Sequence, residues 1–351
     1  MVLRVGIEQE FVFVDASGTY LDADTSDYAL FSSIVDEFPS FERDDVYFEC
    51  KSLETFPKRC YVEGFERHAP DGALIETLPK ALEIRTLPHT DVSAVVQEFC
   101  DSYNGVMDLA RRRGLEPVLT SRHPFKASID LGARLDGAEK AVRTEAELAL
   151  AVRAMLTHGI HVNVSVDHFS TDKMLQLVEK INYYMSAFIP WSFSSPFYLG
   201  AAFNGLCSRN YYRAETRRMA DLHHKQGGHV LEFRGFDACG DARLLQALLT
   251  LYCAFILDES LPGRLPEQDA EQLQRSSLMG FEDPSVRQQG RLVLAAARTA
   301  LNDDDGSLDL LETLLNENDC YASRMKNRFA KTGSILESIS GQYDFQAPAF
   351  R

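Results

Sequence analysis

The sequence lacks any apolar run that could cross a membrane, and it shows no secretory leader. No stretch of the 351-residue chain approaches the roughly 20 apolar residues that a membrane helix needs. The first ten residues, MVLRVGIEQE, lack the apolar segment and the small-residue cleavage site of a signal peptide. We therefore expect no membrane partner.

Cysteine spacings typical of zinc sites and of disulfide frameworks are also missing. The seven cysteines are odd in number and form no CxxC pair. This pattern suits reduced thiols better than structural disulfides. Together with the missing leader, it predicts a cytoplasmic protein.

The chain has fewer positive than negative side chains. The chain carries 36 lysines and arginines against 52 acidic residues, a formal net charge of −16. Such a surplus argues against binding to nucleic acid through its phosphates. It also allows metal ions to be gathered, provided that specific acidic residues come together.

The familiar nucleotide and hydrolase motifs are absent. The sequence contains no GxxxxGK[ST], no GxGxxG, no HExxH and no GxSxG. These absences disfavour a P-loop, a Rossmann cofactor site, a zinc protease helix and a hydrolase nucleophile elbow. A bound nucleotide would have to be held by metals and a sheet.

Hydrophobic periodicity predicts strands in the first two thirds of the chain and helices in the last. Residues 2–14, 115–120, 159–166 and 228–236 are expected as strands, and 72–88 as two short strands broken near Pro79. The stretch up to about residue 70 looks polar and irregular. Helical spacing predicts helices over 91–113, 143–157, 171–188, 241–258, 267–277, 284–301, 307–316 and 319–340. These elements predict an α+β fold in one domain, with a sheet core over about 1–260 and a helical extension over about 261–351.

Glu8 and Glu10 are the first candidate site residues. In GIEQEFV they lie two apart on a strand and so project from the same face. Two adjacent carboxylates on an otherwise apolar strand are costly unless a cation or arginines neutralise them. The alternative is a solvated edge strand.

Three further segments carry candidate residues. Glu76 and Glu83 flank Pro79, where a turn would let both point inward; otherwise they are unrelated surface acids. His161 shares one face of its strand with Asn163, and is either a metal ligand or a hydrogen-bonded core residue.

Glu232 and Arg234 in HVLEFRGFD also share one strand face. They form either a structural ion pair or a metal ligand beside a phosphate-binding arginine. Several carboxylates and one imidazole directed at one face suit Mg²⁺ or Mn²⁺, the ions that a triphosphate needs.

An ordered set of motifs resembles glutamate–cysteine ligase family 2, the carboxylate–amine ligases of the glutamine synthetase superfamily. VGIEQEFVFVD resembles the GxExE opening of that family. The other matching segments, over about residues 4–240, are ALEIRT, His123–Phe125, HGIHVNVSVD, SSPFYLG, Cys207–Arg209 and VLEFRGFD.

The resemblance implies a curved, mostly antiparallel sheet with helices on its outer side and ATP in its concave face. It implies Arg234 and Glu8 as catalytic residues, Arg209 as a ligand of the substrate carboxylate, and an acyl phosphate formed on glutamate or a similar acid and then attacked by an amine. The metal ligands that it implies are Glu8, Glu10, Glu76, Glu83, His161 and Glu232.

Three features depart from the family pattern. Arg85 follows Glu83 on the same face, where it could fill space or bind a substrate anion; the segment 207–232 is short; and the C-terminal region lacks a helix rich in tryptophan and arginine. These departures leave the amine acceptor open, and cysteine is not assumed. The sequence also leaves open a homo-oligomer, a non-catalytic nucleotide-binding or regulatory relative, and a metal-dependent hydrolase.

Overall fold

A seven-stranded antiparallel sheet lies at the centre of the computed structural model, which describes residues 2–49, 56–69, 71–214, 218–225, 228–262, 270–301 and 306–346. The strand order is β2-β3-β1-β5-β9-β8, and β4 pairs with one end of β1. A separate hairpin joins β6 and β7. The strands are β1 Leu3–Val14, β2 Cys60–His68, β3 Leu74–Arg85, β4 Glu116–Val118, β5 Ile160–Val166, β6 Phe197–Tyr198, β7 Ala201–Ala202, β8 Ala220–Lys225 and β9 Gly228–Phe233.

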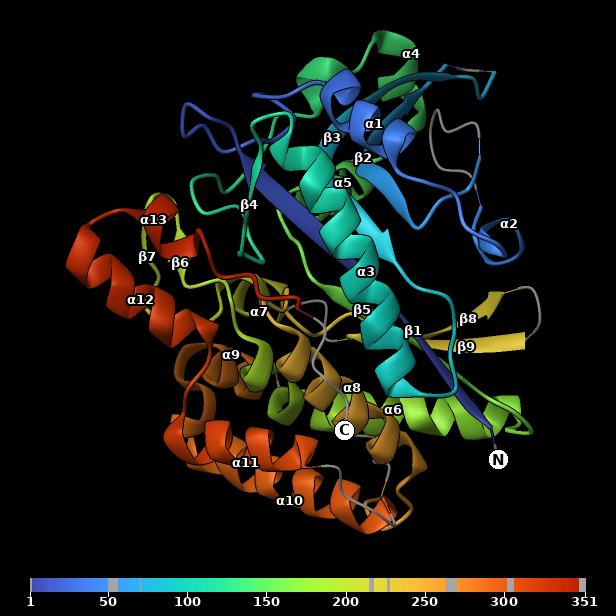
Figure 1. Ribbon diagram of the computed structural model, residues 1–351, viewed down its shortest axis with the longest axis vertical. Coiled ribbons are helices and arrows are strands. Elements are labelled where there is room, and N and C mark those ends of the chain that lie inside the picture. The colour runs from blue at the N-terminus through green and yellow to red at the C-terminus, as the bar shows by residue number, and fades with distance from the viewer. Residues whose placement is uncertain are drawn as a thin grey trace.

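Helices surround this sheet and form most of the C-terminal third (Figure 1). The α-helices are α1 Tyr28–Glu37, α2 Asp44–Tyr47, α3 Val92–Arg111, α4 Gly137–Val142, α5 Glu145–Met155, α6 Thr171–Phe188, α7 Ser208–Arg213, α8 Ala242–Leu257, α9 Ala270–Met279, α10 Pro284–Ala300, α11 Ser307–Glu317, α12 Tyr321–Thr332 and α13 Ile335–Ile339. Within the described residues no helix combines the length and apolar character that spanning a bilayer requires.

The two faces of β1 have opposite characters because successive side chains of a strand point to opposite sides. Val5, Ile7 and Phe11 are fully buried, and the Phe11 ring lies 6.0 Å from Phe99 and 5.2 Å from Tyr103 of α3. Helix α3 thus covers this face, as Figure 1 shows. The intervening glutamates of β1 project from the other face, which carries the candidate site.

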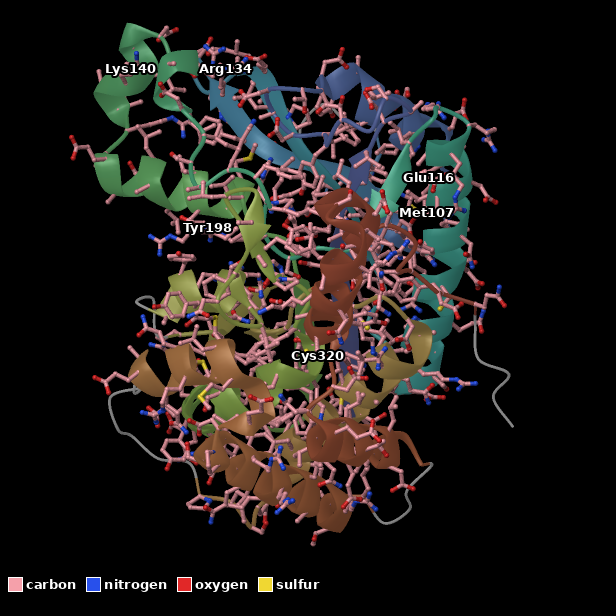
Figure 2. All side chains as sticks on the ribbon, turned by 90° about the vertical axis from the view of Figure 1, so that its left-hand side faces the viewer. Met107, Glu116, Arg134, Lys140, Tyr198 and Cys320 are labelled. Atoms are coloured by element: carbon pink, nitrogen blue, oxygen red, sulfur yellow. The ribbon has the colours of Figure 1, made fainter. Side chains whose placement is uncertain are left out.

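The helical C-terminal region packs on the same hydrophobic core as the sheet. One cluster of buried side chains extends from Val5 of β1 through Leu248 of α8 to Phe345. A second, smaller cluster joins Phe65 of β2 to Met155 of α5. Figure 2 shows α4 at one end of the molecule, marked by Lys140, and α10 and α11 at the other, while α12, which begins after Cys320, runs along the middle.

The predicted antiparallel sheet with helices on its outer side is confirmed, but several element predictions are wrong. The stretch expected to be irregular contains α1 and β2, because Asp27 caps α1 and the polar side chains of β2 have partners on the sheet. β3 runs unbroken through Pro79, where the register with β2 shifts. The helix expected over 319–340 is two helices, separated by Gly333 at φ 69°.

Candidate functional site

Three neighbouring strands bring Glu8, His161 and Glu232 together. Glu8 of β1 lies opposite His161 of β5, and Glu232 of β9 lies opposite Asn163 of β5. One ligand atom from each of the three side chains lies within 4.8 Å of the other two. Among the residues that the structure describes, no other group of three acidic, histidine or cysteine side chains comes this close. We call these three residues the ligand trio.

The distances within the ligand trio suit a shared cation better than direct hydrogen bonds. Nδ1 of His161 lies 3.5 Å from Oε2 of Glu8 and 3.6 Å from Oε1 of Glu232. Ligands of one octahedral Mg²⁺ or Mn²⁺ ion lie roughly 3–4 Å apart, given metal–ligand distances near 2.1 Å. Two carboxylates and one imidazole also form a donor set that these ions accept. The residues therefore fit the metal predicted from the sequence.

Glu10 lies near the ligand trio, but its charge is neutralised within the protein. Its side chain is buried, forms an ion pair with Lys80 of β3, and accepts a hydrogen bond of 3.0 Å from the backbone N–H of Gly159. Both carboxylate oxygens thus have a protein donor. These contacts are typical of a structural residue. They do not support the metal role predicted for Glu10.

Glu83 lies directly opposite Glu10 and is fully enclosed. Tyr61 of β2 donates a hydrogen bond of 2.6 Å to its Oε1. Burial raises the pKa of Glu83 well above its usual range, and the negative charges of Glu8, Glu63 and Glu10 add to the effect. These effects favour the neutral form of the carboxyl, and a metal role for Glu83 remains a prediction.

The structure does not bring Glu76 to the site. Its half-exposed side chain pairs at 2.8 Å with Arg67 of β2, which also binds Glu139 at 2.7 Å. The expected turn at Pro79 does not exist, so Glu76 lies about 20 Å along the same strand from Glu83. The prediction that Glu76 ligates the metal is not supported.

Arg234 lies beside the ligand trio, as predicted. Its Nη2 lies 2.6 Å from Oε2 of Glu232, and about half of the side chain is exposed. Burial lowers the pKa of Arg234, but the bond to Glu232 outweighs it and raises the value overall. The guanidinium thus stays charged and partly accessible, which suits a phosphate contact.

The two arginines predicted to bind substrate are instead held by the protein. Arg85 lies over the rings of Phe48 and Tyr61 and donates from Nε to the carbonyl of Lys58 at 2.8 Å. These contacts enclose the side chain, and Arg85 as a whole is only 5% exposed. A substrate role for Arg85 therefore has no geometric support.

Arg209 is almost fully buried at the start of α7. It donates to the carbonyls of Arg234 and Phe236, both at 3.0 Å, and to Asp237 at 3.3 Å. Gly159 allows this approach, because a Cβ there would lie 2.4 Å from Nη2 of Arg209. Arg209 therefore fixes the end of β9, and with it Arg234, rather than facing a substrate carboxylate.

Two residues near the site were missed by sequence reasoning. Nε2 of His223, on β8, lies 2.8 Å from Oε2 of Glu232 without the alignment of a hydrogen bond. Arg213 donates to the carbonyl of Arg234 at 3.2 Å; burial and the nearby charge of Arg209 lower its pKa to about 9. The alternation in DLHHKQGGHVLEF around a Gly–Gly turn could have revealed β8 and His223.

Comparison with known proteins identifies a family and several relatives. The family model described as "Glutamate-cysteine ligase family 2 (GCS2)" matches residues 4–220. A putative glutamate–cysteine ligase 2-1 from Frankia casuarinae is 29% identical over 125 residues, which cover 36% of this chain and 32% of that protein. The chain thus spans about a third of the length of the curated relatives that it matches.

Solved structures share the fold. A bifunctional glutathione synthetase from Pasteurella multocida superimposes with a TM-score of 0.60 at 14% identity, over 96% of this chain and 51% of that chain. The glutamate–cysteine ligase from Francisella tularensis, in complex with AMP, gives a TM-score of 0.56 at 12% identity, over 97% of this chain and 88% of that chain. At such low identity these similarities show the fold alone.

Proposed function

Because the chain belongs to glutamate–cysteine ligase family 2, we propose that it is an ATP-dependent carboxylate–amine ligase that activates the γ-carboxylate of glutamate or a similar acid. The observation that carries the proposal is the ligand trio with Arg234 beside it. Cation ligands next to a charged, partly accessible arginine are what the transfer of a phosphoryl group requires. The AMP bound to the Francisella tularensis ligase supports ATP as the second substrate.

Each residue of the site has a task in this reaction. Glu8, His161 and Glu232 would hold Mg²⁺ or Mn²⁺, which supplies charge to offset that on the phosphoryl oxygens. Arg234 would donate to the transferred phosphoryl group from the N–H groups that Glu232 does not use. Arg209 and Arg213 hold the backbone carbonyl of Arg234 and so keep that side chain at the edge of the ligand trio.

The proposed reaction proceeds in two steps. A carboxylate oxygen of the acid first attacks the γ-phosphorus of ATP, and ADP leaves with the electrons of the broken P–O bond. The amine nitrogen then attacks the acyl carbon, the C–O bond to phosphate breaks, and the nitrogen loses a proton. The products are an amide, ADP and inorganic phosphate.

Release of ADP in defined mixtures tests the proposal. We expect release only when Mg²⁺, ATP, a carboxylic acid and an amine are all present. Release with neither acid nor amine would identify a hydrolase, and ATP binding without release under any mixture would identify a non-catalytic relative. Either result would overturn the ligase proposal.

Hydroxylamine provides a second readout, because it attacks an acyl phosphate and yields a hydroxamate that is detected by colour or mass. The wild-type chain should form glutamyl hydroxamate, and the Arg234→Gln variant should form far less. Glu116→Gln is a control for the loss of a charge, since Glu116 is exposed on β4, beside α3 in Figure 2. Equal yields from all three proteins would contradict the role of Arg234.

A further inference from the structure

Asn163 lies beside the ligand trio, and the proposed reaction gives it no task. It is on β5, the strand between β1 and β9, two residues from His161 on the same face. Its Cα partner on β9 is Glu232, and the Cβ atoms of two residues paired in this way lie about 5 Å apart. Asn163 therefore borders the place where the side chains of the ligand trio converge.

The Oδ1 atom of Asn163 is buried and has no hydrogen-bond partner in the part of the chain that the structure describes. Such a carbonyl oxygen is unfavourable, because burial removes its hydrogen bonds to water. On the other side of Glu232, on β8, Nε2 of His223 is a second buried polar atom without a hydrogen bond. Two such atoms beside one carboxylate are typical of a site that binds an ion.

The residues across the sheet from Asn163 offer Oδ1 no side-chain donor. On one side the partner is Glu232, whose carboxylate binds Arg234, and an ionised carboxylate only accepts hydrogen bonds. On the other side the partner is Gly6, which has no side chain. A divalent cation is a ligand that the carbonyl oxygen of Asn163 and the carboxylate of Glu232 can share.

A neutral oxygen also suits the charge and the coordination of this site. Glu8 and Glu232 carry two negative charges between them, which balance one divalent cation, so an amide adds no excess charge. Carbonyl oxygens are among the donors that Mg²⁺ and Mn²⁺ prefer. These ions take roughly six ligands, so four protein atoms leave about two positions that phosphate oxygens of a nucleotide can fill.

We propose that Asn163 is the fourth protein ligand of the cation, through Oδ1. This inference rests on the metal site of the proposed function. The four ligands then come from β1, β5 and β9, and two of them, His161 and Asn163, project from one face of β5. Because one strand holds both, the backbone sets the spacing between them.

Variants of Asn163 test the assignment through Mn²⁺ binding to the full chain, followed by electron paramagnetic resonance without nucleotide. Asn163→Leu keeps the approximate size of the side chain and removes its oxygen, so it should weaken Mn²⁺ binding at least about tenfold. Asn163→Asp keeps an oxygen and adds a charge, so it should bind Mn²⁺ at least as tightly as the wild type. Ser165→Ala, two residues further on the same face, is the control and should bind like the wild type.

Asn163→Asp separates ligation from a structural contact. If Asn163 instead donates from Nδ2 to Glu232, an aspartate would repel that carboxylate and weaken Mn²⁺ binding as leucine does. That result, or wild-type binding by Asn163→Leu, would overturn the inference. The melting temperature of Asn163→Asp should fall in EDTA, where the added charge is not balanced, and should recover with Mn²⁺. A melting temperature that Mn²⁺ does not raise would also contradict ligation.

These outcomes do not depend on the ligase reaction, because Mn²⁺ binding needs neither acid nor amine. A chain that binds Mn²⁺ through Asn163 but releases no ADP would contradict the ligase proposal alone. A chain that forms the amide while Asn163→Leu binds Mn²⁺ normally would contradict this inference alone. Absence of Mn²⁺ binding to the wild type would contradict both.

Discussion

Two adjacent parts of the sheet face that carries Glu8 and Glu10 both contain glutamates, but these glutamates have different partners. In the ligand trio, the His161 imidazole lies about 3.5 Å from the carboxylate oxygens of Glu8 and Glu232. Two residues further along β1, Glu10 forms an ion pair with Lys80 and accepts a hydrogen bond from the N–H of Gly159. Opposite it on β3, Glu83 accepts a hydrogen bond from the hydroxyl of Tyr61. We call these last two carboxylates, with Lys80 and Tyr61, the paired rung.

The difference lies in the partners of the carboxylates rather than in their residue type. In the paired rung Lys80 holds Glu10 and Tyr61 holds Glu83, so each carboxyl has a partner in the protein without an ion. In the ligand trio Glu232 is bonded to Arg234, but Glu8 and Glu232 both converge on His161, where a bound cation would offset the repulsion between them. Glu8 and Glu10 illustrate this, since they are two residues apart on one strand.

The largest effect is expected for the ligand trio. Glu8→Gln keeps the shape of the side chain but removes a charged ligand, so ADP release should fall roughly 10²–10³-fold. The unfolding free energy should change little, because one of several repelling charges is lost. Kinetic assays and denaturant titration measure both quantities, with Glu116→Gln as the control. Near wild-type turnover would mean that Glu8 does not serve the reaction.

The paired rung should show the opposite behaviour. Lys80→Met leaves the buried carboxylate of Glu10 without a counter-charge, which should cost about 3–5 kcal/mol in unfolding free energy. The double variant Glu10→Gln with Lys80→Met should recover most of this loss. Urea titration of the wild type, Lys80→Met, Glu10→Gln and the double variant gives the coupling energy. A stable single variant, or no recovery in the double, would contradict a structural role for the pair.

A variant of His223 tests whether the metal site extends beyond the ligand trio. Its Nε2 lies 2.8 Å from Oε2 of Glu232 without a hydrogen bond, so it either ligates the cation or orients Glu232. His223→Gln should weaken Mn²⁺ binding at least about tenfold, as measured by electron paramagnetic resonance. His224, the next residue on β8, points to the other side of the strand. His224→Gln should therefore bind Mn²⁺ like the wild type.

Glu83 gives the smallest effect, a dependence of stability on pH in the metal-free protein. Because its folded pKa is raised above the usual 4.5, its contribution to stability is complete below about pH 4.5 and is lost as pH rises toward the folded value. The loss is at most about 1.4 kcal/mol per pH unit. Glu83→Gln should remove this component when unfolding is followed in EDTA. An identical pH profile in both proteins would show that Glu83 ionises normally.

Three of the six residues predicted as metal ligands lie together as expected, because each is on a strand with clear alternation. Glu8, His161 and Glu232 were expected to be directed at one face, and the structure brings them together. Arg234 was placed beside them for the same reason. The antiparallel sheet and most helices followed from the same periodic patterns.

The residues that sequence reasoning misplaced depend on tertiary contacts. Lys80 neutralises Glu10 only because β3 continues through Pro79 and a register shift re-aims its side chains. Arg209 was predicted to bind substrate, yet its guanidinium donates to the carbonyl of Phe236 and to the carboxylate of Asp237, just after β9. No local pattern reports such long-range partners. The departure noted at Arg85 proved to be a packing feature against Phe48 and Tyr61.

A crystal of the protein soaked with Mn²⁺ and a non-hydrolysable ATP analogue gives the most direct test of the central claim. The anomalous signal of Mn²⁺ locates the ion independently of any assumption about the site. Our account predicts a peak within about 2.3 Å of side-chain atoms of Glu8, His161 and Glu232, with a phosphate oxygen as a further ligand. A peak elsewhere, or none at the ligand trio with the nucleotide bound, would contradict the account.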